Sequence, residues 1–179
     1  MRLAVAVAIG LLCAASAALA GPFGRIEVQA GTGNHVDVIG LGIATSDWFT
    51  YPLGEYFLAQ SHVLGGVAYW GSLDDRPAVA GIYDFSLTPV LRLETSRPGS
   101  SLFVDLGVGI HGLTHTKIND DRTFGSAFQF GEFFGIGVRF GKDRRYEISA
   151  RVQHISNGGI RSANDGITYG SAVFGYNFH

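Results

Sequence analysis

The chain has 179 residues and a formal net charge of −2, from 15 acidic and 13 basic side chains. This balance argues against a nucleic-acid-binding protein, because such proteins usually carry a strongly basic face. Many glycines (26), 12% aromatic residues and only 16% charged residues are an unusual combination for a soluble domain.

The first 20 residues have the pattern of a secretory signal peptide. Arg2 precedes an apolar run over residues 3–12, and small residues around Ala18 and Ala20 end the segment. A charged start, an apolar centre and an A-x-A site predict cleavage after Ala20. The single cysteine, Cys13, lies inside this segment, and the leucine before it disfavours a lipoprotein acylation signal. We therefore expect a mature chain without disulfides.

Residues 21–179 are predicted to form one all-β domain. Apolar and polar side chains alternate in eight segments that are separated by turn-rich gaps, which is the spacing of β-strands. The segments are residues 24–31, 36–44, 55–70, 79–94, 101–114, 123–140, 145–157 and 167–178. Past residue 20, no uninterrupted apolar stretch approaches the ~18 residues that a membrane helix needs.

The polar face of these segments carries glycine and charged side chains, as expected for a small, wet interior. A soluble sandwich would bury its apolar faces against each other, whereas a membrane barrel turns them to lipid. The export signal, the even number of segments and their length of about ten residues favour the barrel. Closure also removes the strand edges that lipid cannot solvate. We therefore predict an eight-stranded antiparallel transmembrane β-barrel.

The predicted interior and the loop lengths extend this interpretation. With both termini in the periplasm, the gaps that contain Asp74, Asp120 and residues 157–166 are extracellular, and residues 141–145 form a tight periplasmic turn. Inward-facing charged residues are expected to form an ion network that fills the small barrel. They are Arg92, Arg139, Arg151, Glu147, Asp84 and Asp105.

Two polar side chains continue the apolar face of segment 145–157. Ile148 and Val152 lie on that face, and by alternation His154 and Ser156 follow them. Residues two apart on a strand lie side by side, within reach of a base–nucleophile hydrogen bond. Polar groups on an apolar face also carry a free-energy cost. The pair predicts a hydrolase site on the outer wall near the extracellular rim; simple contacts with lipid headgroups are the alternative interpretation.

Three short motifs lie in the last third of the chain: GIGVRF at 135–140, HISNGGI at 154–160 and NDGI at 164–167. They resemble the lipid A 3-O-deacylases of the PagL type. The resemblance implies an outer-membrane barrel whose Ser/His/acid triad removes an ester-linked acyl chain from lipid A, without metal or organic cofactor. It further implies Ser156 as the nucleophile, His154 as the general base, and Asn157 or Asn164 as a residue that helps to stabilise the oxyanion.

The chain departs from this family at the triad acid. The family's glutamate falls on Thr168, which has no charge with which to hold the histidine. If the two strands that flank residues 141–145 pair through that turn, Glu132 lies opposite His154 on the same face. Glu132 is therefore the candidate acid, and Asp165 is a second, weaker candidate.

Taken together, the sequence predicts an esterase in the bacterial outer membrane. Its partners would be membrane lipid and the lipid A of lipopolysaccharide in the outer leaflet, with no nucleic acid. The alternative is a catalytically weak relative, or a structural or adhesive barrel without enzymatic activity. His35, His62, His111 and His115 lack a tight metal-ligand spacing. The sequence leaves open the acyl-chain preference, the regulation and the formation of a homodimer.

Overall fold

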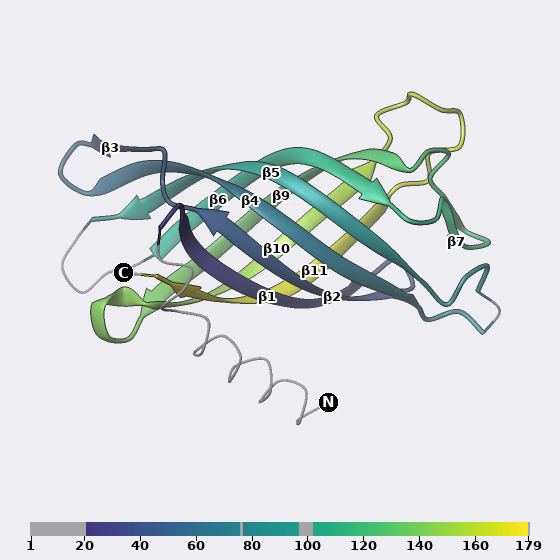
Figure 1. The fold of residues 1–179 in the computed structure, drawn as a ribbon, viewed down its shortest axis with the longest axis horizontal. Helices are drawn as coiled ribbons and strands as arrows, with labels where there is room; N and C mark the ends of the chain where they lie inside the picture. Colours follow the sequence, from purple (N-terminus) through teal and green to yellow (C-terminus); the bar gives the residue numbers. More distant parts are fainter. Residues whose placement is uncertain (1–20, 76, 97–101, 179) are drawn as a thin grey trace.

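The computed structural model describes residues 21–75, 77–96 and 102–178, so the predicted signal peptide lies outside the described residues. Within these ranges, eight long antiparallel strands close into a barrel (Figure 1). They are β1 (Phe23–Gly33), β2 (Val36–Thr45), β4 (Phe57–Ser72), β5 (Gly81–Thr95), β6 (Leu102–Leu113), β9 (Phe128–Phe140), β10 (Tyr146–Ser156) and β11 (Ile167–Asn177). Neighbours follow the order β2-β1-β11-β10-β9-β6-β5-β4, and the pairing of β2 with β4 closes the ring. The predicted eight-stranded antiparallel barrel is confirmed.

The strand ends agree with the sequence prediction to within a few residues, with one larger difference. The segment predicted at 123–140 begins only at Phe128, because Gly125, with a φ of 71°, turns the chain before β9. Ahead of this turn, β7 (Lys117–Asn119) and β8 (Arg122–Thr123) form a small separate hairpin. The predicted segment therefore joins Thr123, the last residue of β8, and the turn at Gly125 to a wall strand.

Two further elements lie in gaps of the predicted pattern. β3 (Phe49–Leu53) pairs with the first residues of β4, in the connection that follows β2. The predicted turn at 141–145 contains a short 3-10 segment, η1 (Lys142–Arg144), that joins β9 to β10. The described residues contain no helix long and apolar enough to cross a membrane.

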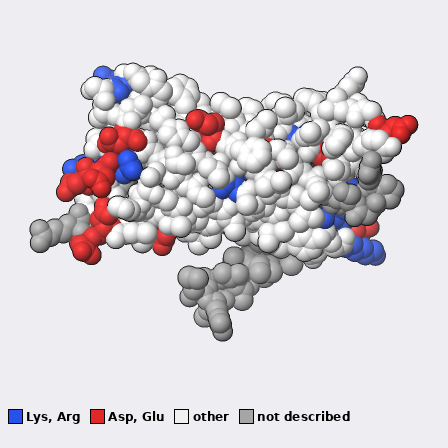
Figure 2. Space-filling view, turned by 180° about the vertical axis from the view of Figure 1, so that it is seen from behind, with Lys and Arg blue, Asp and Glu red and all other residues white. Residues whose placement is uncertain are grey.

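Apolar side chains cover the outside of the barrel wall, and many of the inward side chains are polar or charged. Along β5, Tyr83, Phe85 and Leu87 are exposed, whereas the alternate residues Asp84 and Arg92 are buried. Figure 2 shows an outer surface that is mostly uncharged along the middle of the barrel, with charged side chains gathered mainly towards its two ends. This is the distribution of a barrel that turns its outer face to lipid.

Charged side chains inside the barrel form a connected ion network. Glu147 is at its centre and accepts hydrogen bonds from Arg25, Arg92 and Arg139. Arg92 also donates to Asp105, with a distance of 2.7 Å between Nε and Oδ1. Further ion pairs join Arg139 to Glu94 and Arg151 to Glu27. The predicted interior network is confirmed for these residues, and it fixes the strands to one another across the lumen.

Asp84 was also predicted to belong to the ion network, but it pairs outside it. Its carboxylate lies 2.9 Å from Nδ1 of His111 and pairs with this histidine instead of an arginine. The reason is position: β5 and β6 are neighbours, and the inward face of β6 presents His111 beside Asp84. Among the described residues, no three His, Cys, Asp or Glu side chains are grouped closely enough to hold a metal ion.

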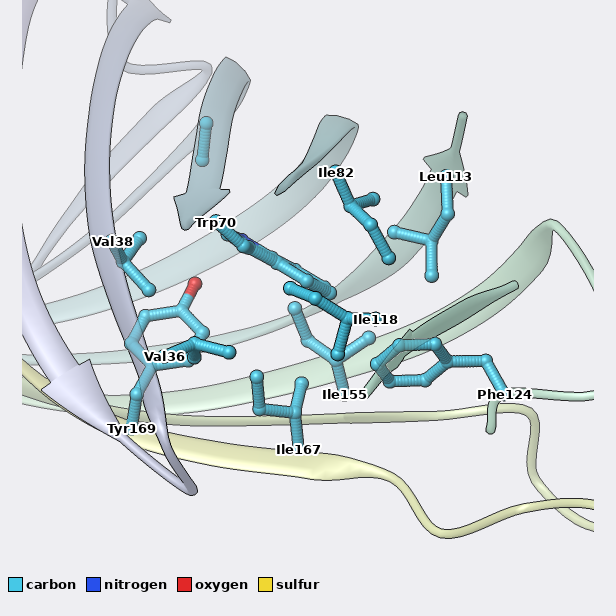
Figure 3. Close-up of a cluster of buried hydrophobic side chains, with 11 residues drawn as sticks. Val36, Val38, Trp70, Ile82, Leu113, Ile118, Phe124, Ile155, Ile167 and Tyr169 are labelled. Carbon is cyan, nitrogen blue, oxygen red and sulfur yellow. The ribbon is translucent and has the colours of Figure 1, made fainter. Parts of the chain in front are cut away.

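A cluster of buried apolar side chains, here called the loop-end cluster, closes the lumen at the end with the long loops (Figure 3). Ile118 and Phe124 come from the loop that carries β7 and β8, and both are fully buried. The Phe124 ring lies 5.8 Å from the ring of Trp70, measured between centroids. The other members are inward-facing residues of the wall strands: Val36, Val38, Ala68, Ile82, Leu113, Ile155, Ile167 and Tyr169. These contacts hold the loop against the inward-facing side chains of the wall, so that it covers this end of the lumen.

Candidate active site

His154 and Ser156 lie at the end of β10, on the outward face of the strand. Both are half-buried, and the alternate residues Gln153 and Ile155 are buried inside the barrel. The loop that follows β10 lies at the end of the barrel opposite the C-terminus (Figure 1). The two side chains therefore occupy the outer rim of the loop end, where the sequence predicted them.

His154 lies between polar neighbours on both adjacent strands. The strand register pairs it with Glu132 on β9 and with Thr168 on β11. The predicted cross-strand pairing of Glu132 with His154 is confirmed. The imidazole contacts Thr168, with Nδ1 at 2.8 Å from Oγ1. Glu132 is exposed, and its side chain makes no hydrogen bond or ion pair with the part of the chain that is described.

The hydroxyl of Thr168 can pair with either neutral tautomer of His154, because it can donate to Nδ1 or accept from it. In the tautomer in which Nδ1–H donates a hydrogen bond to the hydroxyl oxygen, Nε2 is unprotonated and able to act as a base. In the described residues, His154 and Ser156 do not yet share a hydrogen bond. Such contacts are often long before substrate binds. A neutral hydroxyl thus takes the place at which the resemblance leads one to expect a carboxylate.

Gly166 brings β11 close to both side chains. A Cβ atom at this position would lie 3.1 Å from Cε1 of His154 and 3.4 Å from Cβ of Ser156. Its φ of 61° is in the left-handed region, which favours glycine. Any larger residue would crowd the histidine and the serine and would also strain the turn into β11.

Asn157 holds the loop that follows β10 and is fully buried. Its Nδ2 donates to the backbone oxygens of Phe124 and Ala163, both at 2.8 Å, and its Oδ1 accepts from the backbone N–H of Gly159. Both amide hydrogens are therefore directed at carbonyl groups. In this arrangement the Asn157 side chain orients the loop after β10.

Asn164 is better placed to donate. Its Oδ1 accepts a hydrogen bond from the backbone N–H of Asn157 at 2.8 Å. That N–H belongs to the peptide bond that follows Ser156, so the carboxamide of Asn164 lies next to the serine backbone. Within the described ranges, the Nδ2 group of Asn164 has no hydrogen-bond partner. A fixed carboxamide with a spare donor is what an oxyanion site requires.

Asp165, the second candidate acid, is engaged elsewhere. Its Oδ2 accepts from the backbone N–H of Thr123 at 2.7 Å, and its own N–H donates to the Thr123 oxygen at 3.2 Å. These bonds fasten the loop after β10 to β8. They also engage the carboxylate of Asp165, which therefore does not serve as the acid partner of His154. Sequence reasoning missed this connection, because nothing in the local pattern links residues so far apart.

An apolar groove opens on the same outer face of the barrel. It is lined by Phe85, Leu87, Ile110, Gly112 and Phe128, with backbone from the residues between them. Ser156 pairs with Phe130 on β9, and Phe130 pairs with Ile110 on β6. Since neighbouring strands are ~4.8 Å apart, the groove begins roughly 10 Å from the serine.

The chain matches known proteins over most of its length. The family model described as Lipid A 3-O-deacylase (PagL) matches residues 38–177. A protein named Lipid A deacylase PagL from Bordetella bronchiseptica is 28% identical over 174 residues, covering 96% of this chain and 93% of the relative. The protein of the same name from Pseudomonas aeruginosa is 29% identical over 102 residues, covering 57% of this chain and 56% of the relative. The crystal structure of the outer membrane enzyme PagL matches with a TM-score of 0.75 at 23% identity, covering 85% of this chain and 98% of that one, which supports the fold.

Proposed function

Because the chain belongs to the family of PagL lipid A 3-O-deacylases, we propose that it is an outer-membrane ester hydrolase that removes a 3-O-linked acyl chain from lipid A. The observation that carries the proposal is the outward pair His154 and Ser156 at the loop end of β10. Such a pair on the lipid-facing side of a barrel meets a membrane lipid before any solute.

The proposed reaction is acyl transfer to Ser156 followed by hydrolysis. Nε2 of His154 takes the hydroxyl proton while the serine oxygen attacks the ester carbonyl carbon. The Nδ2 group of Asn164 donates to the oxyanion of the tetrahedral intermediate. The sugar oxygen leaves with the proton that His154 holds. A water molecule, deprotonated by the same histidine, then releases the fatty acid and restores the serine.

Thr168 and Glu132 share the task of the third triad member in this proposal. Thr168 accepts a hydrogen bond from Nδ1–H and sets the orientation of the ring, as their 2.8 Å contact supports. Glu132 stands on the opposite side of His154 and supplies negative charge as the imidazolium forms. A lipid-facing carboxylate is unfavourable, although by less than the ~2–4 kcal/mol of an arginine or lysine at the membrane midplane, and by less still near the membrane surface. A glutamate at this site is therefore better explained by a functional role than by stability.

The surroundings of the pair support a lipid substrate. The groove that includes Leu87, Ile110 and Phe128 offers an apolar surface for an acyl chain that extends from the ester. The loop-end cluster fills the lumen beneath the site, so the substrate would arrive along the outer wall. Lipid A contains such an ester, and as a lipid of the outer leaflet it would reach the site along the outer wall.

Mass spectrometry of lipid A from Gram-negative cells that express the protein tests the proposal. Wild-type protein should remove one hydroxyacyl chain, and Ser156→Ala should leave lipid A intact. Ser149→Ala, at a serine on the inward face of the same strand, is the matched control and should act like wild type. Unmodified lipid A in cells that contain folded wild-type barrel, as judged by heat-modifiable migration, would favour a structural barrel instead.

A further inference from the structure

The hairpin of β3 and the beginning of β4 carries exposed apolar side chains at the end of the barrel opposite the candidate active site (Figure 1). All residues of β3 are exposed. Phe49 is 49% exposed, Tyr51 63% and Leu53 46%, and Phe57 at the start of β4 is 44% exposed. Large apolar side chains in this number are not expected to face water without a partner.

The strand register places these side chains on the outer face of the wall. Tyr51 pairs with Ala59. Leu53 pairs with Phe57, and paired residues share a face. The even-numbered Gln60 of β4 is buried inside the barrel, so the odd-numbered residues of this strand point outward. The apolar side of the hairpin is therefore the same side that the barrel turns to lipid.

The apolar side of the hairpin is also continuous with the rest of the outer wall. Ala59 pairs with Leu93 on β5, and Leu91 follows two residues along the same face. Leu91 and Leu93 are 48% and 40% exposed and belong to the apolar outer surface. No polar side chain separates Tyr51 from this surface along the row of paired residues, which runs from Tyr51 through Ala59 to Leu93.

The free edge of β3 limits how deep the hairpin can lie. Among the described strands, β3 pairs only with β4, so its other edge has unpaired backbone groups. Such groups are strongly unfavourable in hydrocarbon, which contains no water to satisfy them. The apolar face requires lipid and the free edge requires water, and both conditions are met in the headgroup region of a membrane.

The side chains of the hairpin are of the type that occupies this region. Trp48, just before β3, is 69% exposed, and Tyr51 and Tyr56 add two phenol groups. Tryptophan and tyrosine are enriched at both membrane interfaces, because they combine an apolar ring with a polar tip. We propose that the hairpin Phe49–Phe57 binds the headgroup region of the phospholipid leaflet opposite the candidate active site. It would fix the depth of the barrel through this contact, whatever chemistry the other end performs.

Spin labels at single cysteines test this proposal directly. Cys13, the only cysteine of the chain, lies in the predicted signal peptide, so the expected mature barrel has no cysteine of its own and permits labels at chosen positions. Tyr51→Cys and Leu53→Cys report the outer face, and Thr50→Cys is the matched control, because it pairs with the inward Gln60. Leu91→Cys calibrates the lipid-facing wall, and Asp120→Cys calibrates water. The barrels are placed in vesicles of phosphatidylethanolamine and phosphatidylglycerol, and collisions with oxygen and with a water-soluble nickel complex are measured.

The proposal expects an ordered set of oxygen-to-nickel collision ratios. The labels at positions 51 and 53 should give ratios between those of the Leu91 and Asp120 calibrators and above that of position 50. Ratios at 51 and 53 equal to the Asp120 calibrator would place the hairpin in water and overturn the proposal. Dipolar broadening between labels at position 51, with low access to both reagents, would overturn it in favour of a second copy of the chain. Heat-modifiable migration confirms that each labelled barrel is folded.

Discussion

Two glutamates on adjacent strands of this barrel occupy opposite environments. Glu147 on β10 is buried in the lumen and accepts hydrogen bonds from three arginines and from Asn177. Glu132 on β9 faces outward beside His154, and its carboxylate has no hydrogen bond or ion pair with other described residues. The inner carboxylate accepts several hydrogen bonds, whereas both oxygens of the outer one remain free to accept hydrogen bonds.

The difference separates stability from chemistry. Buried charges must be paired, so the interior network holds the strands together, and its charged groups are engaged mainly with one another. Outward groups near the rim are hydrated and remain available for proton transfer. Substitutions on the outer face near the rim should therefore change the rate of ester hydrolysis and leave the stability of the barrel unchanged. Substitutions in the network should lower the stability and leave the rate nearly unchanged.

The largest effect on rate is expected at the serine and the histidine. Ser156→Ala and His154→Ala should each lower the rate of ester hydrolysis by at least ~10³-fold, because members of a triad act as a unit. The denaturant midpoint should stay at the wild-type value, since both side chains lie outside the lumen. Release of hydroxy fatty acid from purified lipopolysaccharide measures the rate. A Ser156→Ala protein with wild-type turnover would move the site elsewhere.

Glu132→Gln is expected to be the next largest change. Loss of the charge that stabilises the imidazolium should lower kcat by at least ~10²-fold, less than the ~10⁴-fold of a soluble triad that loses its carboxylate. Adding Thr168→Glu should restore part of the rate, because positions 132 and 168 flank the same histidine. Wild-type kinetics in Glu132→Gln would remove this residue from the mechanism.

Thr168→Val tests the hydroxyl contact with His154 at nearly constant volume. It removes the acceptor for the Nδ1 proton, a hydrogen bond with a net value of about 1 kcal/mol, and should lower kcat by roughly 5–10-fold. Thr168→Ser keeps the hydroxyl and should retain most of the rate. Steady-state kinetics of both variants measure the difference, and equal rates for valine and serine would show that the contact is not used.

Glu147→Gln should have the smallest effect on rate and a large effect on stability. It leaves Arg25, Arg92 and Arg139 without their central carboxylate, and loss of one partner of a buried ion pair costs about 3 kcal/mol or more. Position 147 is seven residues from His154 along the strand, roughly 23 Å, so the rate should stay within about twofold of wild type. Urea unfolding in lipid vesicles together with the ester assay checks both expectations. A matched loss of rate and stability would contradict the separation drawn here.

Sequence periodicity was sufficient to predict the wall of the barrel. Alternation marks a strand wherever one face meets lipid and the other a polar lumen, which is true of all eight wall strands. The hairpin of β3 was missed because its five residues, one of them a proline, are exposed on both faces and show no alternation. The segment predicted at 123–140 began too early, at the last residue of β8, because the turn at Gly125 separates this residue from β9.

The candidate site was predictable as far as it depends on the register. The turn at 141–145 fixes the pairing of β9 with β10, and this places Glu132 opposite His154. The contact of His154 with Thr168, the burial of Asn157 and the bond from Thr123 to Asp165 could not be predicted. They depend on side-chain rotamers and on loops that meet only after the barrel has closed.

The loop-end cluster also bears on whether solutes can pass through the lumen of the barrel. Trp70, Ile118 and Phe124 are fully buried and pack across the lumen beneath the loops. Below them, the arginines and carboxylates of the ion network bind one another at distances down to 2.7 Å. The part of the chain that is described thus fills the lumen at both levels. We therefore expect nutrients, dyes and hydrophilic antibiotics to find no passage through the barrel, and a cell with many copies in its envelope to be no leakier for them.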